Sequence, residues 1–319
     1  MVLHFGLASL RPDFDDRGEI PAIHEPRSDM KPAPFSYHRP ESVADAVAML
    51  ASLEDAKILA GGQSLMAMMN FRYLAPEHIV DINRISELAE IREECDSIYF
   101  GAMVRQRDAL DSPLVQERCP LLIEALENIG HIQTRNRGTI GGSLSHLDPS
   151  AELPAVFSAL DAVLHVTSAR GPRDIPITDW SLGYMLPNLE PDELLVGITV
   201  PCWPKSHGYA FLEMARRHGD FALAGAGALM ILSADGVILR VAVALTGVDT
   251  GPVRLHDAET ALTGQMPREA IFTEAANAAK TVAGIDDVHA SAGYRQRLAV
   301  VYARRALVKA YDRALQGRL

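Results

Sequence analysis

The spacing of apolar residues divides the first part of the chain into short strands and amphipathic helices. Between residues 40 and 53, apolar positions recur every three or four residues, which predicts a helix with one buried face. Short apolar runs at 57–60 and 79–82, on either side of a helix start at 65–70, predict a βαβ unit. We therefore expect residues 30–85 to form one compact subdomain.

The same reasoning predicts a second, larger subdomain over residues 86–205. Asp148 followed by Pro149 is a favoured start for a helix, which we expect to run through Ala159. Further helical stretches are predicted at 104–110 and 121–129. Strands are predicted at 98–102, 162–167, 173–177 and 193–200, and a linker at 203–206.

The last part of the chain, residues 206–319, predicts a separate domain with an antiparallel sheet and helices. Three apolar runs have strand character, and Asp235-Gly236 between the last two is a strong hairpin signal. These strands are expected at 209–215, 222–233 and 237–247. Helices are expected at 259–262, at 269–282 and in a long C-terminal segment whose apolar face carries Leu298, Val301, Val308 and Leu315.

Two segments with paired glycines carry the strongest functional signal. The first glycine segment is Ala60-Gly61-Gly62-Gln63-Ser64-Leu65, and the second is Thr139-Ile140-Gly141-Gly142-Ser143. Glycine has no Cβ, so the backbone can approach a ligand closely and several N–H groups can converge on one anion. One such pair alone could be an ordinary tight turn. Two in one chain favour a diphosphate held from two sides.

Glu152 lies in the first turn of the helix expected after Asp148, close to the second glycine segment. Its carboxylate could accept hydrogen bonds from a ribose or an adenine. It could equally be an ordinary first-turn residue that interacts favourably with the helix dipole. The residues alone leave both interpretations open.

Composition and charge narrow the class of partner. The 319 residues are 48% hydrophobic and 22% charged, which is ordinary for a globular protein. The formal net charge is −11 and no block of Lys or Arg offsets it, which argues against nucleic acid or an anionic membrane as the partner. No apolar run reaches the ~20 residues that a membrane span requires. We expect a small-molecule or protein partner.

Several familiar chemical motifs are not found in the sequence. Cys95, Cys119 and Cys202 lack the close spacing of zinc or iron–sulfur ligands, so we expect no metal in this chain. Neither a P-loop nor a nucleophile-elbow motif occurs. Gly225 and Gly227 begin like a dinucleotide-binding fingerprint but lie in an apolar, strand-like run, which favours core packing.

Residues 1–29 are polar, rich in proline and irregular in pattern, and Met30 opens the first clear domain. We interpret these residues as an extension, or as the result of a start codon assigned too early. They contain no secretory signal and no twin arginine before an apolar stretch. Together with the scattered cysteines, this predicts a cytoplasmic protein.

A series of short motifs resembles the FAD-binding medium subunit of molybdenum hydroxylases, the family of carbon monoxide dehydrogenase and xanthine dehydrogenase flavoproteins. The motifs are Phe35-Ser36-Tyr37, both glycine segments, Ile129-Gly130, residues 133–138, Asp148-Pro149, Arg216-Arg217, Asp220-Phe221-Ala222 and residues 244–248 and 252–254. The resemblance runs from about residue 30 to the C-terminus. It implies an α+β fold, in which a two-subdomain FAD-binding domain of the PCMH, or vanillyl-alcohol-oxidase-like, type precedes a three-stranded antiparallel sheet with helices.

The resemblance also implies which residues hold FAD. Ile58, Leu59 and the first glycine segment would wrap the diphosphate, and the second glycine segment would bind it from the other subdomain. Ile129 and Leu195 would make apolar contacts, and Glu152 would face the adenosine part. No catalytic residue is expected in this chain. One departure is Glu213, in a segment where many relatives carry a lysine.

Such a subunit works within a complex. The resemblance implies a small iron–sulfur subunit with [2Fe–2S] clusters and a large molybdopterin subunit, assembled as a dimer of heterotrimers. This chain would receive electrons from the clusters and pass them to NAD, oxygen, a quinone or a cytochrome. The alternatives are a self-sufficient FAD-dependent oxidoreductase that acts on a small substrate, and a nucleotide-binding scaffold protein without redox turnover.

Overall fold

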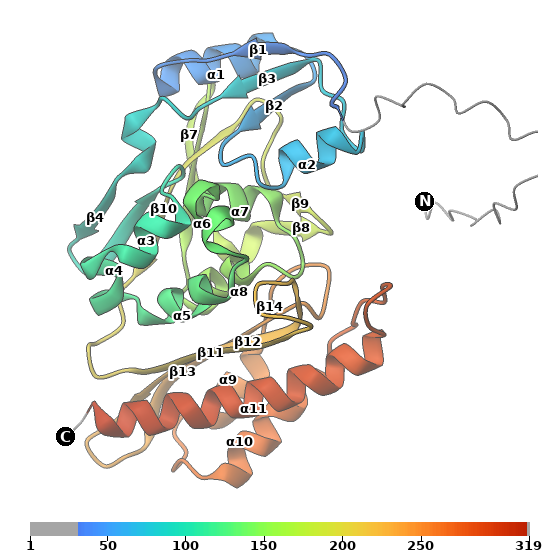
Figure 1. Ribbon diagram of the computed structural model, residues 1–319. Helices are drawn as coiled ribbons and strands as arrows, with labels where there is room; N and C mark the ends of the chain where they lie inside the picture. Colours follow the sequence, from blue (N-terminus) through green and yellow to red (C-terminus); the bar gives the residue numbers. More distant parts are fainter. Residues whose placement is uncertain (1–30, 318–319) are drawn as a thin grey trace, which may run out of the picture.

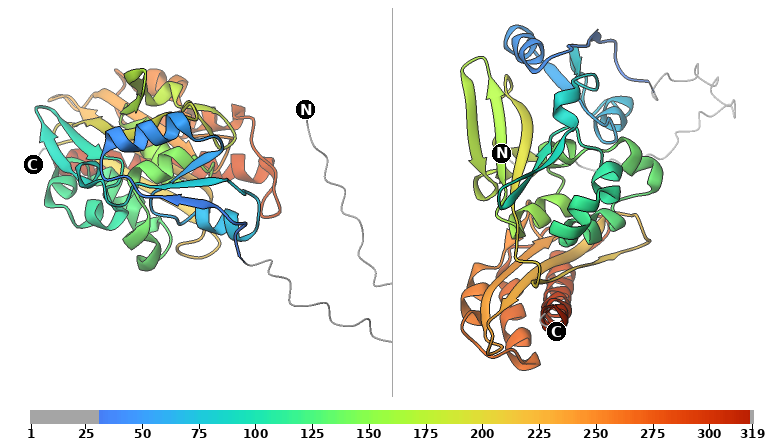
Figure 2. Two further views of the ribbon diagram at one scale, coloured as in Figure 1. Left: turned by 90° about the horizontal axis from the view of Figure 1, so that it is seen from above. Right: turned by 90° about the vertical axis from the view of Figure 1, so that its left-hand side faces the viewer.

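The computed structural model describes residues 31–317, so the expectations for residues 1–29 lie outside the described residues. Three blocks are stacked on one another: a small α/β block, a larger central block, and a C-terminal sheet with helices (Figure 1). The right-hand view of Figure 2 shows the same order of blocks from the side. The mixture of helices and largely antiparallel strands confirms the predicted α+β class.

The first block is a small parallel sheet with two helices. Its strands lie in the order β1 (Ser36–His38), β3 (His78–Asp81) and β2 (Ala56–Leu59). Helix α1 (Val43–Ser52) begins after Ser42, whose hydroxyl accepts a hydrogen bond from the N–H of Asp45. Helix α2 (Leu65–Asn70) lies between β2 and β3 in sequence. The predicted βαβ unit and the helix within 40–53 are confirmed.

The central block is a five-stranded antiparallel sheet covered by short helices. Its strands lie in the order β4 (Ile91–Glu94), β5 (Ser97–Gly101), β10 (Leu194–Pro201), β6 (Val163–Ser168) and β7 (Gly171–Pro176). The helices are α3 (Gln106–Asp111), α4 (Pro113–Arg118), α5 (Pro120–Asn128), α6 (Ile132–Arg137), α7 (Ile140–His146) and α8 (Glu152–Ala159). The smaller elements are η1 (Ser86–Ala89), η2 (Ile177–Asp179) and a hairpin of β8 (Ser181–Gly183) and β9 (Leu186–Pro187).

The predicted start of the helix after Asp148 is wrong. Leu147 adopts a left-handed conformation with φ of 51°, which ends α7 directly before Asp148. Asp148 then closes a turn: its Oδ1 accepts a hydrogen bond from the N–H of Ser150 at 2.8 Å, and its carbonyl accepts one from Ala151 at 2.9 Å. Helix α8 therefore begins only at Glu152, with Ala151 as its N-cap.

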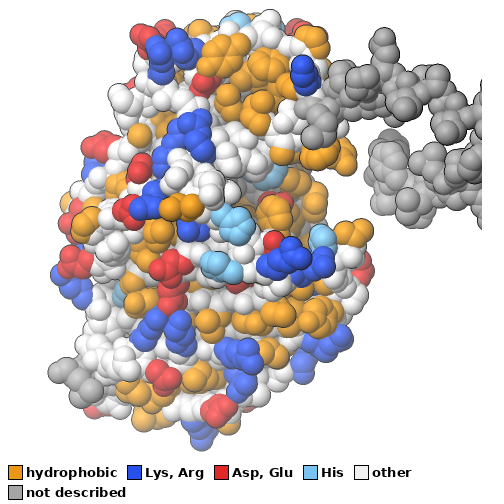
Figure 3. All heavy atoms as spheres, viewed as in Figure 1, with side chains coloured by type: hydrophobic (Ala, Val, Ile, Leu, Met, Phe, Trp, Pro, Cys, Tyr) orange, Lys and Arg blue, Asp and Glu red, His pale blue; other side chains and the backbone are white. Residues whose placement is uncertain are grey.

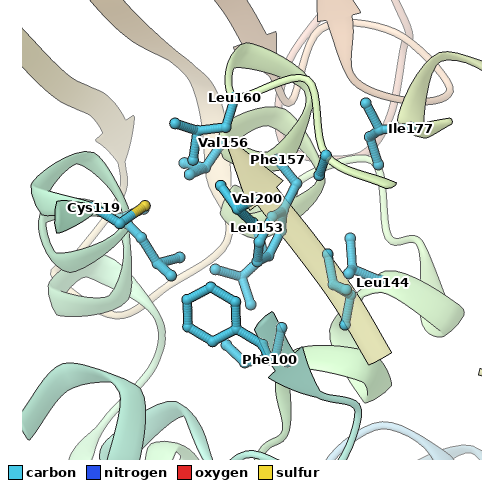
Figure 4. Packing of buried hydrophobic residues seen from close by; sticks show 14 of the residues in the cluster. Phe100, Cys119, Leu144, Leu153, Val156, Phe157, Leu160, Ile177 and Val200 are labelled. Atoms are coloured by element: carbon cyan, nitrogen blue, oxygen red, sulfur yellow. The ribbon is translucent and has the colours of Figure 1, made fainter. Parts of the chain in front are cut away.

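Helices α7 and α8 are anchored by the core of the central block (Figure 4). Leu144 on α7 and Leu153 and Phe157 on α8 are fully buried with Phe100 of β5 and Val200 of β10. Burial of each such side chain contributes about 1.5–3 kcal/mol. The core thus fixes the second glycine segment and Glu152 on the sheet.

The C-terminal block is an antiparallel sheet between α8 on one face and a layer of helices on the other (Figure 1). Its strands lie in the order β11 (Gly208–Ala215), β12 (Ala222–Leu232), β13 (Ile238–Thr246) and β14 (Val253–Arg254). The helices are α9 (His256–Leu262), α10 (Glu269–Ala276), η3 (Asn277–Thr281) and α11 (Ala292–Gln316). The three predicted strands and the turn at Gly236 are confirmed, and β14 adds a two-residue edge.

The predicted apolar face of α11 is wrong for two of its four residues. Val301 and Leu315 are 37% and 39% exposed, whereas the buried face is made mainly of alanine: Ala299, Ala303, Ala306, Leu307, Ala310 and Ala314. The small side chains let α11 lie close to the sheet, so that a Cβ added to Gly208 on β11 would collide with the backbone of Ala310. A pattern of large apolar residues does not reveal such a face.

The segment that connects the central and C-terminal blocks is held by the buried side chain of Trp203. Trp203 is 2% exposed, and the guanidinium of Arg240 lies 4.1 Å from the centre of one of its rings. None of the helices within residues 31–317 combines the length and hydropathy needed to cross a bilayer. Acidic and basic side chains are interspersed on the face shown in Figure 3.

Candidate functional site

A cavity of about 740 Å³ lies where the three blocks meet. Its walls come from the first block, from α5 to α8 and the β8–β9 hairpin of the central block, and from the β11–β12 loop of the C-terminal block. The volume falls within the range of roughly 300–1,000 Å³ that is usual for small-molecule and cofactor pockets. The cavity is thus large enough for an organic ligand.

The first glycine segment forms one wall of this cavity, between the end of β2 and the start of α2. Gly62 has a φ of 72°, in the left-handed region that favours glycine. Among the described residues, the N–H groups of Gly61, Gly62, Gln63 and Ser64 have no hydrogen-bond partner. Unpartnered backbone donors in a cavity wall are suited to an anion.

The two glycine segments, far apart in sequence, face each other. A Cβ added to Gly61 would lie 2.9 Å from the Cα of Gly138, and it would collide with the carbonyl oxygen of Arg137. A Cβ added to Gly142 would lie 3.8 Å from the Cβ of Ala60. Glycine at these positions lets the first and central blocks approach each other at the cavity.

The second glycine segment contributes differently from the first. It forms the first turn of α7, with Thr139 as N-cap, and is not an open loop. The N–H groups of Ile140 and Gly141 donate to the carbonyls of Val104 and Ala102, both at 2.9 Å. The N–H of Gly142 donates to the Thr139 hydroxyl at 3.0 Å. Among the described residues, four N–H donors of the first segment therefore lack partners, whereas in the second segment only that of Thr139 does. The second segment mainly provides close approach.

Most of the other residues predicted to hold the ligand also line the cavity. Ile129 follows α5, and Leu195 lies at a β-bulge where the pairing of β10 with β6 shifts register. The cavity-lining residues from the prediction are Ile58, Ala60, Gly61, Gly62, Gln63, Ser64, Leu65, Ile129, Thr139, Gly141, Gly142, Ser143, Glu152 and Leu195.

Two predicted residues, Leu59 and Ile140, do not line the cavity. Ile140 is fully buried in the core of the central block. Leu59 lies behind the first glycine segment, with its Cδ1 atom 3.2 Å from the position of a Cβ on Gly62. Both residues support the cavity wall from the side away from the ligand space.

Two groups that line the cavity, Glu152 and His146, have pKa values shifted toward their neutral forms. Glu152 is 6% exposed, and burial, together with the negative charge of Glu213, raises its pKa to about 8. Burial also lowers the pKa of His146, although Asp148 opposes this effect. Glu152 is both the first residue of α8 and part of the cavity lining, so its position is compatible with a contact to a ribose or an adenine and with an interaction with the helix dipole.

Gln106 and Phe221 line the cavity but were not predicted as site residues. Gln106 is 5% exposed, and its Oε1 atom has no partner among the described residues. Phe221, in the β11–β12 loop, is 68% exposed. The sequence gives no signal for Gln106, whereas Phe221 lies within the quoted Asp220-Phe221-Ala222 motif.

Comparison with known proteins connects this geometry to a family. Residues 33–203 match the family described as the FAD binding domain in molybdopterin dehydrogenase, and residues 209–310 match the CO dehydrogenase flavoprotein C-terminal domain. The chain belongs to the FAD-binding medium subunits of the molybdenum hydroxylase family.

Relatives of this medium subunit align over nearly their whole length. The 6-hydroxypseudooxynicotine dehydrogenase complex subunit alpha of Paenarthrobacter nicotinovorans is 40% identical, with 89% of this chain and 97% of the relative covered. A solved carbon monoxide dehydrogenase from Hydrogenophaga pseudoflava has a TM-score of 0.87 at 40% identity, and the match covers 89% of this chain and 99% of that chain. Quinoline 2-oxidoreductase from Pseudomonas putida 86 has a TM-score of 0.86 at 34% identity, and the match covers 90% of this chain and 100% of that chain.

The cavity of this medium subunit fits the cofactor of its family. FAD carries an anionic diphosphate, and the first glycine segment presents N–H groups that lack partners within residues 31–317. Larger residues at Gly61 or Gly142 would collide with neighbouring atoms. The named relatives are dehydrogenases, so the family is one of oxidoreductases, and several are subunits of multi-subunit complexes.

Proposed function

We propose that this chain holds FAD in the 740 Å³ cavity, receives electrons from [2Fe–2S] clusters of a partner subunit and passes them to an external acceptor. The observation that supports it most is the set of N–H groups on Gly61 to Ser64: these residues line the cavity, and their N–H groups lack partners within the described range. When bound, FAD would supply the redox chemistry.

The residues of this chain would bind and orient the cofactor. N–H groups of the first glycine segment would offset the charge of the diphosphate. Ile129 and Leu195 would offer apolar contacts, and Glu152 would contact the adenosine part. The exposed Phe221 at the cavity offers a further aromatic surface. This arrangement assigns positioning, rather than bond-making on an organic substrate, to the chain.

Substitution of Gly142 by Asp tests the proposed site. The new side chain would begin 2.6 Å from the Thr139 hydroxyl and add a negative charge near the diphosphate. We expect Gly142→Asp to be purified without FAD, as measured by flavin absorbance per chain. Gly293→Asp is the control, because the nearest atom to a Cβ there is a terminal nitrogen of Arg297 at 3.7 Å. Equal flavin content in both variants would contradict the proposed site.

The proposed partners are a small iron–sulfur subunit and a large molybdopterin subunit, assembled as a dimer of heterotrimers. Support comes from the relatives, several of which are named as medium chains or complex subunits. We expect co-expression with the two proposed partner subunits to yield a complex with flavin and iron–sulfur absorbance bands. Turnover of a small organic substrate by the isolated chain would instead support a self-sufficient oxidoreductase.

A further inference from the structure

Glu152 and Glu213 are two buried carboxyl groups at the junction of the cavity with the C-terminal block. Glu152, the first residue of α8, lines the cavity and is 6% exposed. Its carboxyl group accepts no hydrogen bond from another residue in the described range. Glu213 lies on β11, and its Oε2 atom is buried without a partner among the described residues. Within residues 31–317, no Lys or Arg forms an ion pair with either carboxyl group.

The contacts of the C-terminal sheet explain why the two carboxyl groups come together. Gly225 on β12 pairs with Glu213 on β11 and with Thr246 on β13. The Thr246 hydroxyl donates to the carbonyl of Ala151 at 2.7 Å, which places the start of α8 over this row of the sheet. The row is closely packed at Gly225, because a Cβ there would lie 2.9 Å from the Cβ of Glu213 and 3.0 Å from the Cγ2 of Thr246.

We propose that Glu152 and Glu213 titrate together as a buried pair and couple the binding of an anionic ligand in the cavity to proton uptake. The identity of that ligand as FAD rests on the proposed function, whereas the joint titration of the two carboxyl groups does not. Glu213 is a positioning residue in this account, since it acts on the ligand through the charge state of Glu152.

Two neighbouring carboxylates in a buried site cannot both ionise readily, because burial and mutual repulsion favour the protonated forms. Burial raises the pKa of Glu213 to about 7. Burial and then the charge of Glu213 raise the pKa of Glu152 to about 8, with a smaller contribution from Asp148 on the α7–α8 turn. His146 on α7 is a further titratable group here, and burial lowers its pKa, against the opposing charge of Asp148.

The sign of the coupling follows from these charges. Below the range of pH 7 to 8 the pair is protonated and neutral, so it does not repel a diphosphate. Above this range both carboxyl groups ionise, and the affinity for an anion falls. For a ligand whose binding takes up one proton, the dissociation constant rises by about tenfold per pH unit. Binding is therefore expected to weaken between pH 7 and pH 9.

A titration of the flavin-free full chain with FAD from pH 6 to pH 9 tests the proposal. We expect the wild-type dissociation constant to rise over this range, Glu213→Gln to show a smaller rise, and the double variant Glu152→Gln, Glu213→Gln to show none. Glu127→Gln, at an exposed glutamate of α5, serves as the control and should follow the wild type. The same pH dependence in the wild type and the double variant would overturn the proposal.

A second measurement keeps this test independent of the cofactor. Both raised pKa values mean that the folded state binds more protons than the unfolded state, so the pair stabilises the fold at low pH. In the ligand-free chain this contribution is lost as the pH rises from about 4.3, the unfolded value, through about 8. We expect this loss of unfolding free energy in the wild type and not in the double variant. Equal profiles of stability against pH would overturn the joint titration of the pair. Absence of FAD binding at every pH would contradict the proposed function alone.

Discussion

Gly61 and Gly142 determine how closely the walls of the cavity approach each other. At Gly61 a side chain would collide with the backbone of Arg137 and Gly138, which cannot move away without displacing α6. At Gly142 a side chain would meet the Thr139 hydroxyl that caps α7. The requirement for glycine is steric at both positions, and at neither does a positive φ contribute, since that occurs at Gly62.

Substitution of Gly61 by Val should therefore separate the first block from the central block. The added atoms would overpack the contact with Gly138 and cost about 1–3 kcal/mol of folding free energy. We expect the variant to lose FAD and to unfold at lower denaturant concentration. Gly293→Ala, at an open position in α11, should keep both properties. Retention of wild-type flavin content in Gly61→Val would contradict the close approach.

Helices α5 and α11 hold the C-terminal block against the central block through Glu124. Its carboxylate accepts hydrogen bonds from the N–H of Phe211 at 2.8 Å, from Lys309 at 2.9 Å and from Arg313 at 2.6 Å. Burial alone would raise the pKa of Glu124, but these bonds outweigh burial and lower it. The lowered pKa means that the carboxylate form stabilises the contact.

Glu124→Gln should weaken this contact by about 1–3 kcal/mol at neutral pH. Because the folded-state pKa is lowered, the contribution of Glu124 is present above the unfolded value of about 4.3 and is lost as the pH falls through the folded value. The free energy of unfolding, measured with denaturant, should thus differ between variant and wild type at pH 7, and the difference should be smaller at pH 3. Glu117→Gln, which removes an exposed pair with Lys205, should change stability little at either pH. A loss of stability in Glu124→Gln that is equal at both pH values would argue against the ionised contact.

Elements with large apolar residues at regular spacing could be predicted from the sequence, and others could not. Helix α1 and strands β11 to β13 follow their hydrophobic patterns. Strand β4 has the sequence IREE, and its single apolar residue gives no strand signal. The buried face of α11 consists of small residues that fit close to a sheet rich in alanine and glycine. The start of α8 depends on the left-handed residue Leu147, which no local motif indicates.

The candidate site is built from all three blocks. Most of its residues could be predicted from the sequence, but their arrangement in space could not. Both glycine segments, Ile129, Glu152 and Leu195 line one cavity as expected. The different roles of the two glycine segments could not be predicted from their sequences. The N–H groups of Ile140 and Gly141 are occupied by the carbonyls of Val104 and Ala102, which are distant in sequence. Their assignment to FAD stays a prediction.

A ligand that bridges the three blocks should stabilise the whole chain. Ligand that binds only the folded state at a concentration one hundred times its dissociation constant adds about 2.7 kcal/mol, which corresponds to a rise in Tm of about 5 °C. We expect this rise with FAD and a smaller one with riboflavin, which lacks the diphosphate that the first glycine segment would bind. Equal shifts with both ligands at equal concentration would contradict a role for the diphosphate.

A crystal structure of the full chain with FAD bound tests the central claim most directly. The account predicts diphosphate oxygens at about 2.7–3.2 Å from backbone nitrogens between Gly61 and Ser64, with the second glycine segment in contact on the opposite side. A flavin whose diphosphate lies elsewhere, with those N–H groups facing water, would contradict it.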